Sequence, residues 1–141
     1  MSKFITKEDY GASIHAEILD AVTRSDATII DLCEERAISE MKRPLSKRYD
    51  VEEIFSAEGK ERNQTVLMMA IDIALYHIFS IHNPRNISQV RVDRYKRAMI
   101  WLKEVRDGNE DVNGLPELEP MDREKTSRYL LRSNPKRSNY I

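Results

Sequence analysis

The sequence predicts an all-α protein, a bundle of about four helices, and three observations support this class. In several segments apolar residues recur three and four positions apart, the spacing that gives a helix one buried face. No segment alternates apolar and polar residues for long enough to require a β-strand. A chain of 141 residues with 40% apolar and 33% charged residues is typical of a globular domain. We expect helices at roughly 13–23, 26–43, 61–82 and 88–107, a short helical turn near 50–55 and an extended C-terminal tail.

The first two predicted helices follow polar capping residues. Thr6, with Asp9 in an acidic first turn, precedes the first helix. Ser25 or Asp26 caps the second, and Pro44 limits it because the residue before a proline disfavours the helical conformation. The buried stripe of the second helix is expected to hold Ile29, Ile30, Leu32, Cys33, Ala37 and Met41, and its polar face to hold Asp31, Glu34, Glu35 and Lys42.

The third predicted helix is apolar on nearly all its sides, so other helices should surround it. Asp72 interrupts this helix. One interpretation is a general acid or base with a raised pKa. The favoured interpretation is structural: an ion pair with Arg94 or another base on the neighbouring helix, or a gap that faces solvent. No second carboxylate stands in a position that would support catalysis.

The last predicted helix and the short helical turn have clear start signals. Ser88 caps the fourth helix and Gly108 suits its left-handed end. Asp50 caps the short turn, with Glu53 in the position that completes a capping box. The buried stripe of the fourth helix is expected to hold Val92, Tyr95, Ala98, Met99, Leu102 and Val105.

The residues that could carry chemistry do not form a constellation. The three histidines do not share one helix face, Cys33 is the single cysteine, and four scattered glycines form no phosphate-binding loop. We therefore expect no enzyme, no metal and no cofactor. The start of the chain has no signal-peptide pattern, and the longest apolar run is too short for a membrane span of about 20 residues. Assembly in a reducing cytoplasm without membrane contact is expected.

The C-terminal part differs in charge from the rest. Residues 121–141 hold six basic and two acidic residues, whereas residues 1–120 hold 17 basic and 22 acidic ones. The segment 109–120, with an Asn-Gly turn and two prolines, is a linker or an ordered loop. We divide the chain into a helical domain at 1–110, and a linker and basic arm at 111–141.

The basic arm has too few apolar residues to order by itself. Ordering roughly 20 residues costs about 1–2 kcal/mol each, while burying an apolar anchor returns about 1.5–3 kcal/mol. The arm is therefore either disordered or ordered on the surface of a folded partner. Its expected interface residues, toward a partner or a neighbouring subunit, are Arg128, Tyr129, Leu130, Leu131, Arg132, Lys136, Arg137, Tyr140 and Ile141.

Three segments resemble a family of small helical proteins from Mu-like phages and prophages: RYDVEEIF at 48–55, AIDIALYHIF at 70–79 and RYKRAMIWLKEVRDG at 94–108. Through that family the chain is similar to the head-tail connector proteins of tailed phages, also called adaptor or head-completion proteins. The resemblance covers about residues 4–110 and departs at Pro44, and the tail after about residue 115 has no counterpart. We expect structural roles for the polar and core residues Tyr49, Asp50, Asp72, Tyr76, Arg94 and Tyr95.

The resemblance implies a structural virion protein. Such proteins form a ring, commonly of twelve copies, beneath the portal protein in the neck between head and tail. The ring extends the DNA channel, through which DNA passes without sequence-specific binding, and it docks the tail or a stopper protein. The alternative function is a helical regulatory or nucleic-acid-binding module. It would use the arm and the basic face of the fourth helix, formed by Arg91, Arg94, Lys96 and Arg97. The favoured interpretation of this cluster is a solvated face balanced by Asp93.

Overall fold

Helices form nearly all the regular structure in the computed structural model, which describes residues 4–24 and 26–118. These residues contain no β-strand, only an isolated bridge between Tyr49 and Glu117. The all-α class is therefore confirmed. The elements are the 3₁₀ turns η1 (Lys7–Ala12) and η2 (Gly59–Glu61) and the α-helices α1 (Ala16–Thr23), α2 (Ala27–Leu45), α3 (Val51–Ser56), α4 (Gln64–His82) and α5 (Gln89–Arg106).

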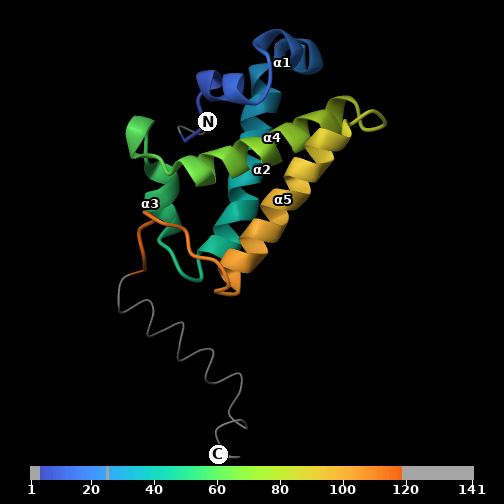
Figure 1. Cartoon of the computed structure of the whole chain (residues 1–141). Coiled ribbons are helices and arrows are strands. Elements are labelled where there is room, and N and C mark those ends of the chain that lie inside the picture. The colour runs from blue at the N-terminus through green and yellow to red at the C-terminus, as the bar shows by residue number, and fades with distance from the viewer. Residues whose placement is uncertain (1–3, 25, 119–141) are drawn as a thin grey trace, which may run out of the picture.

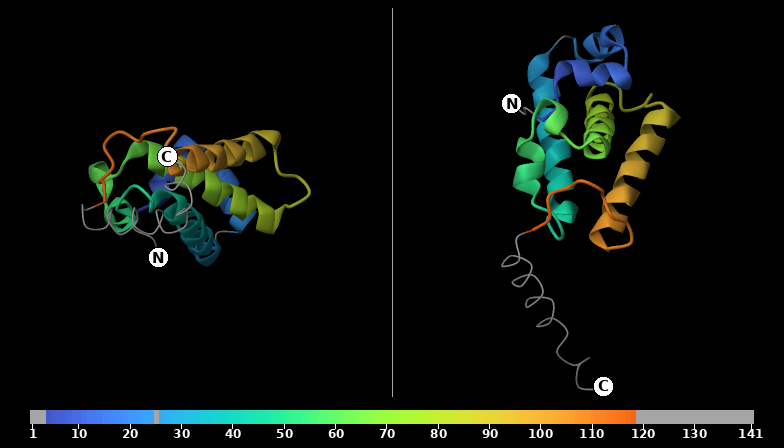
Figure 2. Two further views of the ribbon diagram at one scale, coloured as in Figure 1. Left: turned by 90° about the horizontal axis from the view of Figure 1, so that it is seen from below. Right: turned by 60° about the vertical axis from the view of Figure 1, so that its left-hand side comes forward.

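Helix α4 lies at the centre of the bundle. It packs mainly against α2 and α5, and its C-terminal half also meets α1 (Figure 1). The right-hand view of Figure 2 shows α4 nearly end-on, with α2 on one side and α5 on the other. Among the described residues, α4 is the one helix long and apolar enough to cross a membrane. Its sides are mostly covered by protein, so the predicted surrounded helix is the core helix of this bundle.

Side-chain caps mark where α2, α3, α4 and α5 begin. The Asp26 carboxylate accepts from the Thr28 amide (3.0 Å), and the Asp50 carboxylate accepts from the Glu53 amide (3.2 Å). Ser88 caps α5 as predicted. Asn63 caps α4, so this helix begins at Gln64 rather than near residue 61.

The N-terminal segment differs from the prediction. Residues 7–12 form the separate turn η1, and the first α-helix begins at Ala16 instead of near residue 13. Arg62 holds this segment in place, because its guanidinium donates to the Phe4 carbonyl (2.8 Å) and to the Asp9 carboxylate (2.5 Å). Burial opposes ionisation of Asp9, but hydrogen bonds from Arg62 and Thr6 outweigh it and lower its pKa.

Pro44 lies inside α2, so the expectation that the helix ends at residue 43 was wrong by two residues. A proline in the last turn removes only its own hydrogen bond to the residue four positions earlier, Glu40. The next turn still closes, since the Ser46 amide donates to the Lys42 carbonyl (2.8 Å). Leu45 is fully buried, and its packing favours the extra helical residues.

The segment after α5 is an ordered loop up to residue 118. Gly108 has a φ of +82°, as expected of a left-handed helix end. Val112 and Leu115 are buried against the helices. The Asp50 amide donates to the Pro116 carbonyl (2.9 Å), which ties the loop to the start of α3. Residues 119–141, and with them the predicted basic arm, lie outside the described residues, so the division of the chain at residue 110 stays a prediction.

Candidate interaction surfaces

A cluster of aromatic and polar side chains joins α2, α4 and α5. The Tyr76 and Tyr95 rings stack with their centroids 4.0 Å apart. The Tyr95 hydroxyl donates to Glu40 (3.4 Å), whose other oxygen lies 2.5 Å from Nε2 of His77. Burial and the nearby Glu40 carboxylate raise the pKa of Tyr95. The contacts of Tyr76 and Tyr95 thus hold three helices together.

Asp72 is buried and paired with a base on α5. The residue is 3% exposed, and its carboxylate accepts from the Arg97 guanidinium at 2.7 Å. The partner is thus Arg97, one turn beyond Arg94. Of the interpretations left open by the sequence, the structure shows the ion pair with the neighbouring helix.

Tyr49 and Asp50 form the junction between α2 and α3. The Tyr49 hydroxyl accepts from the Val112 amide (3.1 Å), and the Arg48 guanidinium lies 5.4 Å from the centre of the Tyr49 ring. Arg48 also pairs with Asp111. The nine residues expected at an arm interface, from Arg128 to Ile141, lie outside the described residues.

The predicted basic face of α5 is partly used within the chain. Arg97 pairs with Asp72, and the Arg91 guanidinium donates to the Ser13 carbonyl (2.7 Å). Burial and the neighbouring Arg94 lower the pKa of Arg91. This face therefore offers less free positive charge to an external partner than its sequence implies.

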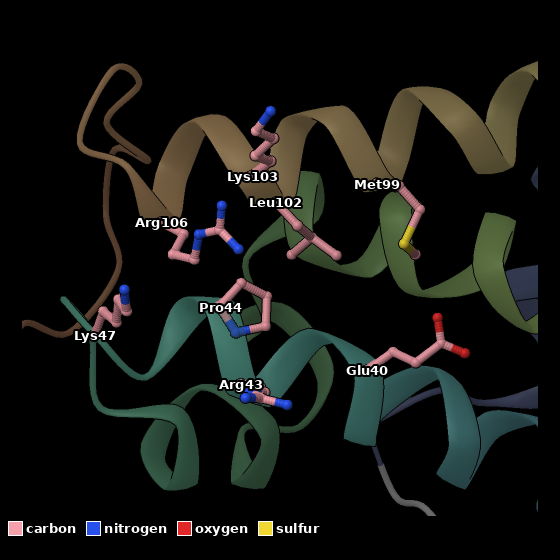
Figure 3. Close-up of a pocket in the computed structure, with 8 residues that line it drawn as sticks. All are labelled: Glu40, Arg43, Pro44, Lys47, Met99, Leu102, Lys103 and Arg106. Carbon is pink, nitrogen blue, oxygen red and sulfur yellow. The ribbon is translucent and has the colours of Figure 1, made fainter.

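A different basic surface lies between the C-terminal parts of α2 and α5 (Figure 3). It is a half-open groove of about 310 Å³, which we call the basic groove. Sequence reasoning missed it because its cations come from segments about 60 residues apart. Its lining consists of Glu40, Arg43, Pro44, Lys47, Met99, Leu102, Lys103 and Arg106.

The positive charge of the basic groove is largely unpaired. Arg106 donates to Asp107 at 3.0 Å, and this hydrogen bond lowers the pKa of Asp107. Arg43, Lys47 and Lys103 form no ion pair within residues 4–24 and 26–118. The groove can therefore attract an acidic partner.

The segment of α3 and η2 is net negative, with four glutamates and one exposed cation, Lys60. Glu52, Glu53, Glu58 and Glu61 are all exposed, and we call these four residues the acidic corner. Glu52 pairs with Lys42 on α2 at 3.3 Å. The other three glutamates form no ion pair in the part of the chain that the structure describes.

Glu34 was expected on the polar face of the second helix, but it is buried, with 4% exposure. The N-terminal segment covers it, and the Tyr10 hydroxyl donates to its carboxylate at 2.7 Å. The pKa of Glu34 is raised to about 7. Burial is the main cause, repulsion from Asp31 and Asp9 raises the pKa further, and the hydrogen bond from Tyr10 opposes the rise in part. Burial and the nearby Glu34 also raise the pKa of Tyr10.

Cys33 does not offer a reactive thiol. Cys33 is fully buried, and burial raises the pKa of its thiol, which disfavours the reactive thiolate. No group of three His, Cys, Asp or Glu side chains within the described residues could hold a metal ion.

Comparison with known families covers nearly the whole chain. The family model described as bacteriophage Mu, Gp36, matches residues 4–129. The match extends beyond the resemblance recognised in the sequence and includes the start of the basic arm, which was expected to have no counterpart. Neither the curated proteins nor the solved structures contain a match. Because the family model spans most of the sequence, the chain belongs to the bacteriophage Mu Gp36 family and is a phage structural or morphogenetic protein.

Proposed function

We propose that the protein is a head-tail connector that forms a ring beneath the portal in the phage neck, extends the DNA channel and docks the tail or a stopper protein. The observation that carries this proposal is that the chain just before the basic arm is bonded to the start of α3 and to the residues that precede it. The Leu118 amide donates to the Arg48 carbonyl (3.4 Å), beside the bond from Asp50 to Pro116. A positively charged arm thus continues from a defined position on an acidic body.

The arm is long enough to contact a neighbouring protein. The 23 residues after Leu118 can span at most about 80 Å when fully extended. The partners in this proposal are the portal, neighbouring copies in a ring, proposed to number twelve, and the tail or stopper protein. No membrane contact, cofactor or catalytic activity forms part of the proposal. Of the polar residues singled out by the sequence, Asp72, Tyr76 and Tyr95 serve as contacts between helices.

Deletion of residues 121–141 tests the role of the arm. We expect the truncated protein to keep its helical circular dichroism and to lose co-sedimentation with the cognate portal. Unchanged docking of the truncated protein would overturn this role.

Phage assembled without the chain tests the position in the neck. We expect electron micrographs to show filled or partly filled heads separated from complete tails. Normal joined particles would contradict the connector function.

The rival function is a nucleic-acid-binding module, and the unpaired cations of the basic groove are the observation that favours it. It predicts affinity for duplex DNA that falls steeply as salt rises. We expect no sequence-specific binding at any salt concentration, since Arg91 and Arg97 on the predicted basic face are engaged within the chain. Tight, specific binding to a DNA sequence would favour the rival.

A further inference from the structure

We infer that the basic groove of one copy receives the acidic corner of the next copy, so that these two surfaces form the subunit interface of the ring. This inference rests on the proposed connector function, and it names the surfaces through which the copies meet. Both surfaces belong to the described residues, and neither includes the basic arm.

Four cations line the basic groove with one carboxylate, Glu40, which already accepts from Tyr95 and lies beside His77. Lys103 and Arg106 lie three residues apart on α5, a spacing at which like charges repel. Arg43 is in the last turn of α2, and Lys47 follows its end, so cations line both sides of the groove (Figure 3). The C-terminal dipoles of α2 and α5 offset about half a unit charge each. An external acidic surface would relieve the remaining repulsion.

The floor of the groove adds an apolar contribution. Pro44 and Met99 are half-buried and Leu102 is buried beneath them. A partner seated between the two helices would cover the exposed parts of Pro44 and Met99 as well as pair with the cations. An apolar centre within a charged rim is the usual composition of a specific protein interface.

The acidic corner has the complementary features. Glu53, Glu58 and Glu61 have no ion pair among the described residues, so their charges are available to a partner. Ala57, between these glutamates, is partly exposed and can contact the groove floor, whereas the Phe55 ring packs edge-to-face against Phe4 in the core. In Figure 1, α3 and the turn that follows it lie at the left edge of the bundle.

The positions of the two surfaces favour a ring over a two-fold dimer. In Figure 1, α3 lies at the left of the molecule, whereas the C-terminal end of α5 lies at the bottom, next to the end of α2. The groove and the corner are different patches, so the contact joins unlike surfaces of successive copies. Contacts of this heterologous type close into rings when the rotation between copies permits it.

Paired charge reversals in the full-length chain test the interface. The groove variant carries Lys47→Glu and Lys103→Glu, and the corner variant carries Glu53→Lys and Glu61→Lys. We expect the protein concentration at which each variant alone assembles to rise at least about tenfold, because like charges then face each other. Sedimentation velocity, with and without portal, measures this concentration.

Mixing the two variants is the decisive step. Each contact in an alternating assembly of groove and corner variants again joins opposite charges, so an equimolar mixture should recover assembly. A chain that carries all four substitutions should also assemble with itself, but not with the wild-type chain. Lys96→Glu on α5 and Glu17→Lys on α1 are matched controls, since both residues are exposed and outside the two surfaces. All variants should keep wild-type circular dichroism.

The outcomes distinguish a failure of the proposed interface from a failure of the connector function. Rings that form normally from both single-surface variants would overturn the inference and leave the connector function intact. A groove variant that assembles normally but loses non-specific DNA affinity would assign the groove to the nucleic acid instead. If the wild-type chain neither self-associates nor binds portal, the connector function fails and the inference fails with it.

Discussion

Two buried carboxylates in the same bundle have partners of different kinds. Asp72 on α4 meets the Arg97 guanidinium, which supplies a full counter-charge. Glu34 on α2 meets the Tyr10 hydroxyl, which supplies a hydrogen bond but no charge. Burial raises the pKa of Glu34 to about 7, because a hydrogen bond from a neutral group only partly replaces hydration. Two carboxylates of similar burial thus have partners of different charge, and the neutral partner leaves Glu34 with a raised pKa.

The largest expected effect is a pH dependence of stability that comes from Glu34. The folded pKa of about 7 lies above the ordinary value of 4.5, so between these pH values the native state binds more protons than the unfolded state. Stability therefore falls as the pH rises through this window, by roughly 3 kcal/mol in all. Urea unfolding at pH 5 and pH 8 measures the loss.

Glu34→Gln provides the control for this pH dependence. A glutamine keeps an oxygen that can accept from Tyr10 but cannot ionise. We expect the variant to lack the Glu34 contribution to the pH profile and to exceed the wild-type stability at pH 8. Parallel wild-type and variant profiles would contradict the assignment of the slope to Glu34.

The next effect is the loss of the charged partner of Asp72. Arg97→Ala leaves a buried carboxylate without its guanidinium, and we expect a loss of about 2 kcal/mol, less than for a fully buried pair because Arg97 is half-exposed. Arg94→Ala is the matched control and should change stability by less than about 0.5 kcal/mol. Equal losses for the two variants in urea unfolding at pH 7 would contradict the distinction between these arginines.

The smallest effect in this comparison is the loss of the neutral partner. Tyr10→Phe removes the hydroxyl that donates to Glu34, and we expect a loss of about 1 kcal/mol at pH 5. The loss should be larger at pH 8, because a hydrogen bond to the ionised carboxylate is stronger. A variant with the same loss at both pH values would show that Glu34 does not titrate between them.

The sequence predicted the local features and missed those that depend on tertiary packing. The caps at Asp50 and Ser88 and the central position of α4 follow from patterns within single segments. The burial of Glu34 does not, since the periodicity of α2 places it on the polar face and only the N-terminal segment covers it. The sequence favoured a basic partner for Asp72, but the choice of Arg97 depends on the position of α5 along the axis of α4.

The candidate surfaces show the same limit. The basic groove combines Arg43 and Lys47, in and after the last turn of α2, with Lys103 and Arg106 of α5. These two pairs of cations are far apart in the sequence. The predicted basic face of α5 does lie within one segment, yet packing uses Arg91 and Arg97 internally. The acidic corner, by contrast, is contiguous in sequence and is recognisable as a run of glutamates from 52 to 61.

The attachment of the loop after α5 has a mechanical consequence. Residues 116–118 are tied to residues 48–50 by backbone hydrogen bonds, and Tyr49 accepts from Val112 farther back along the loop. Tension applied at the arm therefore reaches the α2–α3 junction before it reaches α5. A force on the arm is thus shared between the α2–α3 junction and α5, and α5 alone does not bear it.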